Sequence, residues 1–396
     1  MILGNTATLS ECLSLDEDNN SGYSKEFYSA SSELRAQYKN DEEVRQIIDI
    51  ALGLEGLRRQ DGIHAAAVVI SPDVITNFLP VQKKGKDAEL VTQYEMHTVE
   101  QLGLLKMDFL GLRNLSIIDR TLELIDDESF NIDELPLTDK KTFELFSSGK
   151  MTGVFQLESR VAQATARSLK PKRFEDIVAL VALIRPGPLG ANMHIEFADR
   201  ATGKKEIEFL HNDLKEILEE TYGVILYQEQ VMQIAQKISG FQLDEADDLR
   251  KAMGKKIPKV MEQQRKKFTD GALQNGYSEQ FSMELFDQIA FFAGYGFNKS
   301  HSVPYALLAY QTAYLKANYP AEYLSACLTA VKRDKERTAV FLAEARDIGV
   351  NVKTPDINLS TEDFSVANGE ILFGLSAIRN VGDITAEKIV FERQNG

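Results

Sequence analysis

Two oppositely charged residues lie close together near the end of an apolar segment. Residues 103–115 read GLLKMDFLGLRNL, so only Met107 separates Lys106 from Asp108. If this segment is a β-strand, both side chains point to the same face, because side chains alternate along a strand. A turn and a helix follow, and sheet enzymes often place chemistry at the carboxyl end of a strand. Lys106 and Asp108 are therefore candidate catalytic residues, although their spacing alone favours a solvated ion pair at a sheet edge.

A single arginine follows the most apolar segment of the chain. Arg185 stands directly before Pro-Gly-Pro in the segment VALIRPGPL. A guanidinium held at the end of a packed helix suits phosphate or carboxylate binding, because its planar fork is always charged. The alternative is a helix-terminating turn with an incidental basic residue.

Residues 250–267, here called the basic strip, concentrate positive charge. They contain one acid, Glu262, and have a local charge of +7. Such a strip could follow a phosphate backbone, or it could be a solvated helix face. Its eight basic residues are Arg250, Lys251, Lys255, Lys256, Lys259, Arg265, Lys266 and Lys267.

The segment FFAGYGFNKSHS, residues 291–302, combines glycines with hydrogen-bond donors. Gly294 and Gly296 permit a tight turn, and Lys299, Ser300 and His301 would lie close to the start of the next helix. A helix N-terminus favours anions, so this loop is a candidate phosphate site. A structural turn with a buried histidine is the alternative.

The composition excludes several classes of protein. The 396 residues carry 45 Lys+Arg against 60 Asp+Glu, and the formal charge of -15 argues against a nucleic-acid partner unless cations gather locally. Cys12 and Cys327 are the two cysteines, which excludes a disulfide-stapled fold and indicates a reducing compartment. The longest apolar run, Ile177 to Ile184, is too short to span a bilayer. With no signal peptide at the start, we expect a cytoplasmic protein without a membrane segment.

The candidate residues need a small sheet followed by a large helical body. The first 40 residues are polar and acidic without sustained periodicity, so we expect no independent domain there. Apolar spacing from Val44 to Leu52 predicts a helix that starts after Asn40 or Asp41 and ends near 56–59. Residues 65–70, 90–94 and 102–109 are predicted strands of one small sheet.

Beyond residue 111 the predicted elements are mainly helices. One strand is expected at 222–227, and short strands and turns follow residue 352 before a final helix near 384. The predicted helices cover 112–125, 142–146, 174–184, 228–238, 243–253, 257–275, 279–293, 302–317 and 321–331.

These motifs together resemble a known family. In colinear order from about Asp41, they closely resemble the α subunit of bacterial DNA polymerase III, the C family of replicative DNA polymerases. The matching segments are QDGIHAAAVVISPD, GLLKMDFLGLRNL, GVFQLESR, FEDIVALVALIRPGPL, YGVILYQEQVMQIAQ, LRKAMGKK, FAGYGFNKSHSVPYALLAYQTAYLKANYPAEY and PDIN.

The resemblance implies an α+β, mostly helical fold with part of a polymerase β-like palm. Residues 1–62 would be a partial thumb, 63–110 the C-terminal strands of the palm, 111–350 the fingers, and 351–396 the end of the fingers and the start of a helix-hairpin-helix region. In that last region, Asn380 stands where the hairpin usually has its first glycine.

The resemblance also implies templated addition of dNTPs to a primer 3′-hydroxyl by two-metal phosphoryl transfer with Mg²⁺. Asp108 matches the third of three metal-binding aspartates, and Lys106 and Arg113 would lie near the primer terminus or the incoming nucleotide. The residues expected to face the triphosphate or the DNA backbone are Arg160, Arg185, Arg250, Lys255, Lys256, Lys299, Ser300 and His301.

The first two aspartates and the preceding PHP domain find no match. Asp16 and Asp18 have the Asp-x-Asp spacing but no strand pattern. We therefore expect the isolated chain to be inactive without the N-terminal polymerase half. Its expected partners are primer-template DNA, dNTPs and, through regions outside this chain, the sliding clamp and the proofreading exonuclease. The alternative is a non-catalytic DNA- or partner-binding fragment of the replisome.

Overall fold

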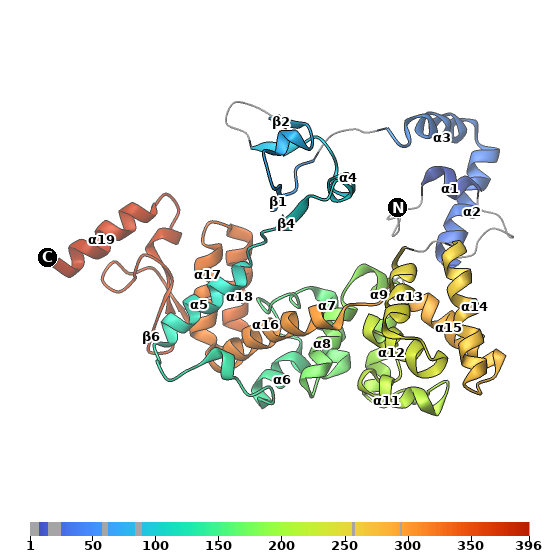
Figure 1. Ribbon diagram of the computed structural model, residues 1–396. Coiled ribbons are helices and arrows are strands. Elements are labelled where there is room, and N and C mark those ends of the chain that lie inside the picture. Colours follow the sequence, from blue (N-terminus) through green and yellow to red (C-terminus); the bar gives the residue numbers. More distant parts are fainter. Residues whose placement is uncertain are drawn as a thin grey trace. The chain divides into compact units, whose positions relative to one another are not determined.

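The computed structural model describes residues 8–14, 25–57, 62–83, 89–255, 258–293 and 295–395 (Figure 1). The chain divides into two compact units, Met1–Gly111 and Leu112–Gly396. Helices dominate the described residues, which also contain three small sheets, so the expected α+β, mostly helical class is confirmed. None of the described helices is long and apolar enough to cross a membrane.

The first unit begins with the helices α1 (Leu9–Ser14), α2 (Lys25–Asn40) and α3 (Glu42–Leu54). The helix predicted after Asp41 is α3, and Asp41 caps it by accepting hydrogen bonds from the amides of Glu43 and Val44 at 3.0 and 3.2 Å. The segment before residue 40, for which we expected no independent domain, contains α2. That helix packs against α3, which supplies the stabilisation that its own weak periodicity does not.

The strands of the first unit form two ladders instead of the single predicted sheet. β1 (Ala67–Ile70) pairs with β4 (Leu105–Asp108), and β2 (Val81–Lys83) pairs with β3 (Leu90–Thr92), both antiparallel. A short 3₁₀ turn (Ile75–Asn77) and the helix α4 (Met96–Gln101) connect them. The ladders share a small core, with Leu79, Val99 and Leu104 buried. β2 and α4 were not predicted, because segments this short show little periodicity.

The second unit is built from helices. Those predicted from periodicity are present, and α7, α9, α10, α11 and α18 are additional. Residues 222–227 form no strand; only an isolated parallel bridge joins Tyr227 to Phe297. The helices are α5 (Arg113–Ile125), α6 (Lys140–Ser148), α7 (Arg160–Leu169), α8 (Phe174–Leu183), α9 (Pro186–Gly190), α10 (Met193–Ala201), α11 (Lys215–Leu218), α12 (Gln228–Ser239), α13 (Leu243–Lys255), α14 (Pro258–Gln274), α15 (Glu279–Ala293), α16 (Lys299–Asn318), α17 (Pro320–Val331) and α18 (Lys335–Asp347).

Helix α8 forms the centre of this unit. Every residue from Asp176 to Leu183 is buried, as its apolar sequence predicts. Its main neighbour is α16, and the hydroxyl of Ser302 donates to the carbonyl of Val178 at 2.7 Å. α8 therefore gives the residues at its two ends a rigid support.

Lys316 is a fully buried cation in α16. Its side chain is 0% exposed, and Nζ donates to the carbonyls of Lys150 and Thr152, both at 2.8 Å, and to Oε1 of Glu344 at 2.6 Å. Burial lowers the pKa of Lys316, while Glu344 opposes this shift. One side chain thus joins the loop before α7 to α16 and α18.

The chain ends in short strands and a helix, as predicted. β5 (Val352–Lys353), β7 (Glu370–Leu372) and β6 (Ser365–Ala367) form a three-stranded sheet in that order. A 3₁₀ turn (Leu375–Ala377) leads to α19 (Asp383–Asn395). Nζ of Lys332, at the end of α17, lies 2.7 Å from Asp363 and 2.9 Å from Asp383, so ion pairs attach this region to the helical body.

Candidate active site

Lys106 and Asp108 form an ion pair at the end of β4. Nζ of Lys106 donates to the two carboxylate oxygens of Asp108 at 2.7 and 2.9 Å. Both residues stand on one face of the β1–β4 ladder, as their spacing predicts. The Lys106 side chain is 19% exposed and the Asp108 side chain 40%. The carboxylate is thus the more accessible partner.

The surroundings of Asp108 favour its ionised form. The hydrogen bond from Lys106 is the main reason that the pKa of Asp108 lies below its ordinary value. His64 contributes in the same direction, with Nδ1 3.9 Å from Oδ1 of Asp108. Asp108 is therefore an ionised carboxylate at neutral pH.

Asp108 fits one position in a magnesium site. Mg²⁺ commonly binds through one or two carboxylates together with substrate phosphates and water. Lys106 now holds the two oxygens that such an ion would take. In the part of the chain that the structure describes, no group of three or more His, Cys, Asp or Glu side chains is placed to hold a metal.

In the second unit, several candidate residues meet at one loop, residues 295–298 between α15 and α16. The backbone of this loop is fixed to the start of α12: the amide of Phe297 donates to the carbonyl of Leu226 at 3.1 Å, and the amide of Gln228 donates to the carbonyl of Phe297 at 2.9 Å. A Cβ on Gly187 would lie 2.4 Å from the ring of Tyr295. Only glycine therefore lets the Pro-Gly-Pro turn lie this close to the loop.

Arg185 reaches the loop from the end of α8. Its Nε donates to the carbonyl of Ala182 at 2.8 Å and its Nη2 to the carbonyl of Tyr295 at 2.7 Å. The guanidinium lies over the ring of Phe297, 4.1 Å from the centroid. Burial lowers the pKa of Arg185, but an arginine remains charged. Because both hydrogen-bond partners are neutral carbonyls, the positive charge is available to an anion.

Arg250 is connected to the same loop through Gln228. Its Nη1 donates to Oε1 of Gln228 at 3.4 Å, and Nε2 of Gln228 donates to the carbonyl of Gly296 at 3.3 Å. Nε and Nη2 of Arg250 lie 2.8 and 2.7 Å from Oδ1 of Asp247. Much of the charge of Arg250 is therefore neutralised within α13.

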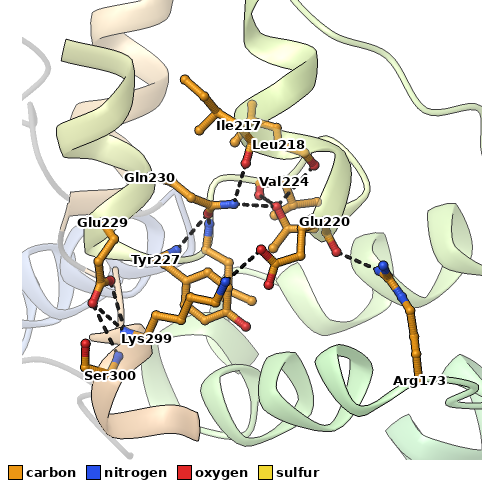
Figure 2. A network of polar contacts seen from close by, with 12 residues as sticks. Arg173, Ile217, Leu218, Glu220, Val224, Tyr227, Glu229, Gln230, Lys299 and Ser300 are labelled. Carbon is orange, nitrogen blue, oxygen red and sulfur yellow. Dashed lines mark hydrogen bonds and ion pairs between the residues drawn. The ribbon is translucent and has the colours of Figure 1, made fainter. Parts of the chain in front are cut away.

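Two glutamates hold the start of α16 (Figure 2). The carboxylate of Glu229 accepts hydrogen bonds from the amide of Lys299 at 2.9 and 3.0 Å and from the amide of Ser300 at 3.4 Å. Nζ of Lys299 donates to Oε2 of Glu220 at 2.7 Å. The N-terminus of α16 thus binds an anion, and that anion is the carboxylate of Glu229.

His301 lies in the first turn of α16, and its side chain is exposed. Its amide donates to Oδ1 of Asn298 at 2.9 Å, which caps the helix. Its ring lies 4.4 Å from the ring of Tyr305 and 5.6 Å from that of Phe297. The alternative of a buried histidine is therefore wrong, and Arg185 and His301 contact the same phenylalanine.

A cavity of about 640 Å³ adjoins the start of α16. The residues that line it include Glu220, Tyr227, Glu229 and Lys299. Within the described residues, the hydroxyl of Tyr227 and Oε1 of Glu220 are buried without a hydrogen-bond partner. Buried polar groups normally have partners, so these two atoms mark a place where a ligand could bind.

The remaining candidates are more dispersed. Arg113 is the first residue of α5 and is exposed. Arg160 begins α7 and lines a cavity of about 360 Å³ with His194 and Asp199. Lys255 ends α13, but its side chain and the whole of Lys256 lie outside the described residues, as do Asp16 and Asp18. The structure gives no side-chain contacts for these last four.

Four of the eight cations of the basic strip pair with acidic residues of α13 and α15. Arg250 and Lys251 pair with Asp247 in α13. Arg265 pairs with Asp287 of α15, and Lys267 lies 2.7 Å from Glu245. The local charge of +7 in the sequence therefore overstates the positive charge that this surface presents.

Sequence reasoning did not identify Glu220, Gln228 and Glu229 as parts of the site. All three contact residues or loops more than sixty positions later in the chain. Spacing cannot reveal partners so far apart, and no local signal marked these residues.

Comparison with known proteins found matches over most of the chain. Residues 3–111 match the model of the bacterial DNA polymerase III alpha NTPase domain, and residues 114–276 match that of the bacterial DNA polymerase III alpha subunit finger domain. Residues 349–396 match a helix-hairpin-helix motif. The chain is 48% identical over 373 residues to the DNA polymerase III subunit alpha of Thermus aquaticus, which covers 92% of this chain and 30% of the relative. The chain belongs to the bacterial DNA polymerase III α-subunit family.

Two further members of the DNA polymerase III α-subunit family show the same relation. The Escherichia coli K12 protein is 46% identical over 382 residues, 93% of this chain and 33% of that protein. A Mycobacterium tuberculosis protein is 45% identical over 366 residues, 91% of this chain and 31% of that protein. The chain thus spans about a third of the length of the curated relatives that it matches.

Proposed function

We propose that this chain forms part of a replicative DNA-directed DNA polymerase that adds dNTPs to a primer 3′-hydroxyl. The observation that carries the proposal is the ionised, accessible carboxylate of Asp108 at the end of β4, held by Lys106 within a segment that matches the family model. A carboxylate of this kind is suited to bind a metal ion that takes part in phosphoryl transfer. Mg²⁺ would supply Lewis-acid stabilisation of the reacting phosphate when bound.

The proposed parts of the polymerase follow from the resemblance. Residues 1–62 would be a partial thumb, 63–110 the C-terminal strands of the palm, 111–350 the fingers, and 351–396 the end of the fingers and the start of the helix-hairpin-helix region. Arg185 would bind a phosphate of the incoming nucleotide, because its charge has only neutral partners. His301, which is exposed beside the Phe297 ring, would contact the same nucleotide. Arg113, Arg160, Arg250, Lys255 and Lys256 remain candidate contacts to DNA or triphosphate.

Primer extension with separate polypeptides tests this proposal. Of the three metal-binding aspartates that the resemblance implies, only Asp108 has a match here, so we expect the purified 396-residue polypeptide to give no extension with primer-template, dNTPs and Mg²⁺. A second polypeptide that carries the Asp-x-Asp strand of a family member should restore extension. Gel analysis of a labelled primer measures both reactions.

Two results would contradict the proposal in different ways. Extension by the 396-residue polypeptide alone, abolished by Asp108→Ala, would refute its expected inactivity. If size-exclusion chromatography shows that the two polypeptides associate but no extension follows, the enzymatic role is wrong. A non-catalytic DNA- or partner-binding module would then remain.

Glu229 occupies the anion position that we propose for a nucleotide phosphate. Glu229→Gln removes a negative charge from the N-terminus of α16, so a phosphate no longer competes with a carboxylate there. Because a charge at a partly buried helix terminus contributes up to about 2 kcal/mol, and a factor of ten corresponds to about 1.4 kcal/mol, we expect the dissociation constant for a dNTP to fall by roughly threefold to thirtyfold. Isothermal titration of the 396-residue polypeptide measures this change.

Glu219→Gln is a matched control for that experiment. Glu219 is exposed and lies beside Glu220, and within the described residues its carboxylate has no ion pair. The control should leave the dissociation constant within about twofold, as surface changes of this kind usually have small effects. An unchanged or weakened affinity in Glu229→Gln would show that Glu229 is a permanent structural cap of α16.

A further inference from the structure

A second group of cations in the helical unit differs from the basic strip in its lack of acidic partners. Arg167, Lys170, Lys172 and Lys204, here called the α7 cluster, line a cavity of about 540 Å³. All four residues are exposed. Among the described residues, no carboxylate pairs with Arg167, Lys170 or Lys172, and only Lys204 lies near one, 3.5 Å from Asp199. Arg167, Lys170 and Lys172 therefore present their charge to solvent.

The acidic residue in the same cavity does not offset this charge. Asp176 has a side chain that is 4% exposed. It accepts hydrogen bonds from the amides of Lys172 and Arg173 at 3.0 and 3.3 Å, from Nε of Arg173 at 3.1 Å and from the hydroxyl of Tyr222 at 2.8 Å. A carboxylate with its oxygens occupied in this way is already neutralised locally. It leaves the exposed cations free to bind an external anion.

The described lining of the cavity is cationic and offers no open aromatic ring to a base. Among the described residues that line it, Tyr222 is the only aromatic one. The guanidinium of Arg173 covers the Tyr222 ring at 5.0 Å, and Phe197 packs against it edge-on at 5.2 Å. The hydroxyl of Tyr222 is engaged by Asp176. No open ring remains for stacking, which is the usual way to hold an unpaired base.

The α7 cluster lies apart from Arg185, the residue that we propose to bind the incoming nucleotide. Asp176 is in the first turn of α8, whereas Arg185 follows the end of that helix. At 1.5 Å per residue, the nine positions between them span about 14 Å. One phosphate group cannot contact both places.

We propose that the α7 cluster binds the phosphodiester backbone of a nucleic-acid strand, without regard to sequence, as a contact separate from the nucleotide site. Four cations that line one cavity supply the charge, and sequence would not matter because contacts to phosphates carry no sequence information. The proposal depends on the proposed function only in that the chain handles nucleic acid.

Charge reversal at two lysines tests the proposal. The double variant Lys170→Glu, Lys172→Glu changes exposed side chains only, so its thermal unfolding should match that of the parent. Its dissociation constant for a fluorescein-labelled 20-nucleotide oligo(dT), measured by anisotropy without Mg²⁺ or dNTPs, should rise at least tenfold. A mixed-sequence strand of the same length should give the same ratio.

The matched control is Lys140→Glu, Lys141→Glu, which makes the same change in charge on the exposed first turn of α6. This control should change the dissociation constant by less than threefold. Equal losses in the two double variants would overturn the proposal, because the effect would then be one of total charge. Unchanged binding in the Lys170, Lys172 variant would also overturn it.

Competition with inorganic tripolyphosphate shows whether the α7 cluster binds a nucleic-acid strand or a small anion. At equal phosphate concentration, tripolyphosphate should displace only a small fraction of the bound oligo(dT). The Lys170→Glu, Lys172→Glu variant should bind oligo(dT) more weakly than the parent. If the variant loses tripolyphosphate binding but keeps the strand, the cluster is a small-anion site and the proposal is wrong. Because these measurements need no catalysis, they stand even if primer extension fails in the reconstituted polymerase.

Discussion

Asp108→Asn is expected to lower primer extension by about three orders of magnitude in a polypeptide that carries the complete palm. The amide keeps the size of the side chain but loses the negative charge that would bind Mg²⁺, and metal-ion stabilisation of this reaction is worth several kcal/mol, or roughly a factor of ten per 1.4 kcal/mol. Single-turnover extension at saturating dNTP measures the loss directly.

Asp119→Asn is the control for this substitution. Asp119 lies on the exposed side of α5, and the same change there should leave the rate within about twofold, as for most surface substitutions. If Asp108→Asn also leaves extension nearly intact, the Lys106–Asp108 pair is only the solvated ion pair that its spacing alone favours. The assignment of Asp108 as a metal ligand would then be withdrawn.

Lys316→Met is expected to destabilise the helical unit by about 3–5 kcal/mol, the range seen when one partner of a buried ion pair is removed. The substitution leaves the carbonyls of Lys150 and Thr152 without their donor and leaves the carboxylate of Glu344 buried without its cation. Urea unfolding of the 396-residue polypeptide, followed by circular dichroism, measures the change in free energy.

Two further variants define the origin of that effect. Lys335→Met alters an exposed lysine at the start of α18 and should change stability by less than about 0.5 kcal/mol. Adding Glu344→Met to Lys316→Met should recover part of the loss, because the uncompensated carboxylate is removed. A loss below about 1 kcal/mol in Lys316→Met would show that water replaces the ammonium group.

Sequence patterns predicted the elements whose structure is determined by residues close together in the chain. Asp41 and the apolar spacing after it fixed α3, and the unbroken apolar run of α8 indicated a helix buried on all sides. The ion pair between Lys106 and Asp108 followed from their spacing of two positions in a strand. In each case the physical cause lies within one or two turns of chain, where sequence spacing is a direct measure of geometry.

The parts of the candidate site that the sequence did not predict depend on contacts between distant segments. Glu229 reaches the start of α16 across 70 positions, and no pattern near either residue reveals that contact. The charge of residues 250–267 could be counted, but Asp287 and Glu245, which neutralise Arg265 and Lys267, lie outside that window. The α7 cluster was missed for the opposite reason: Arg167, Lys170 and Lys172 make only a short run of cations, and only the fold brings Lys204 to them and shows that these three lack an acidic partner among the described residues.

In the ion pairs along the basic strip, carboxylates of the protein itself act as the counterions of the lysines and arginines. When a lysine or arginine binds a DNA phosphate, about 0.9 condensed cation is released into solution. A residue such as Arg265 or Lys267 must first leave its carboxylate, and the freed carboxylate attracts cations from solution, which offsets part of the release. A strand held by these paired residues would therefore respond less to salt than one held by unpaired cations, and a salt titration would count fewer contacts than the complex contains.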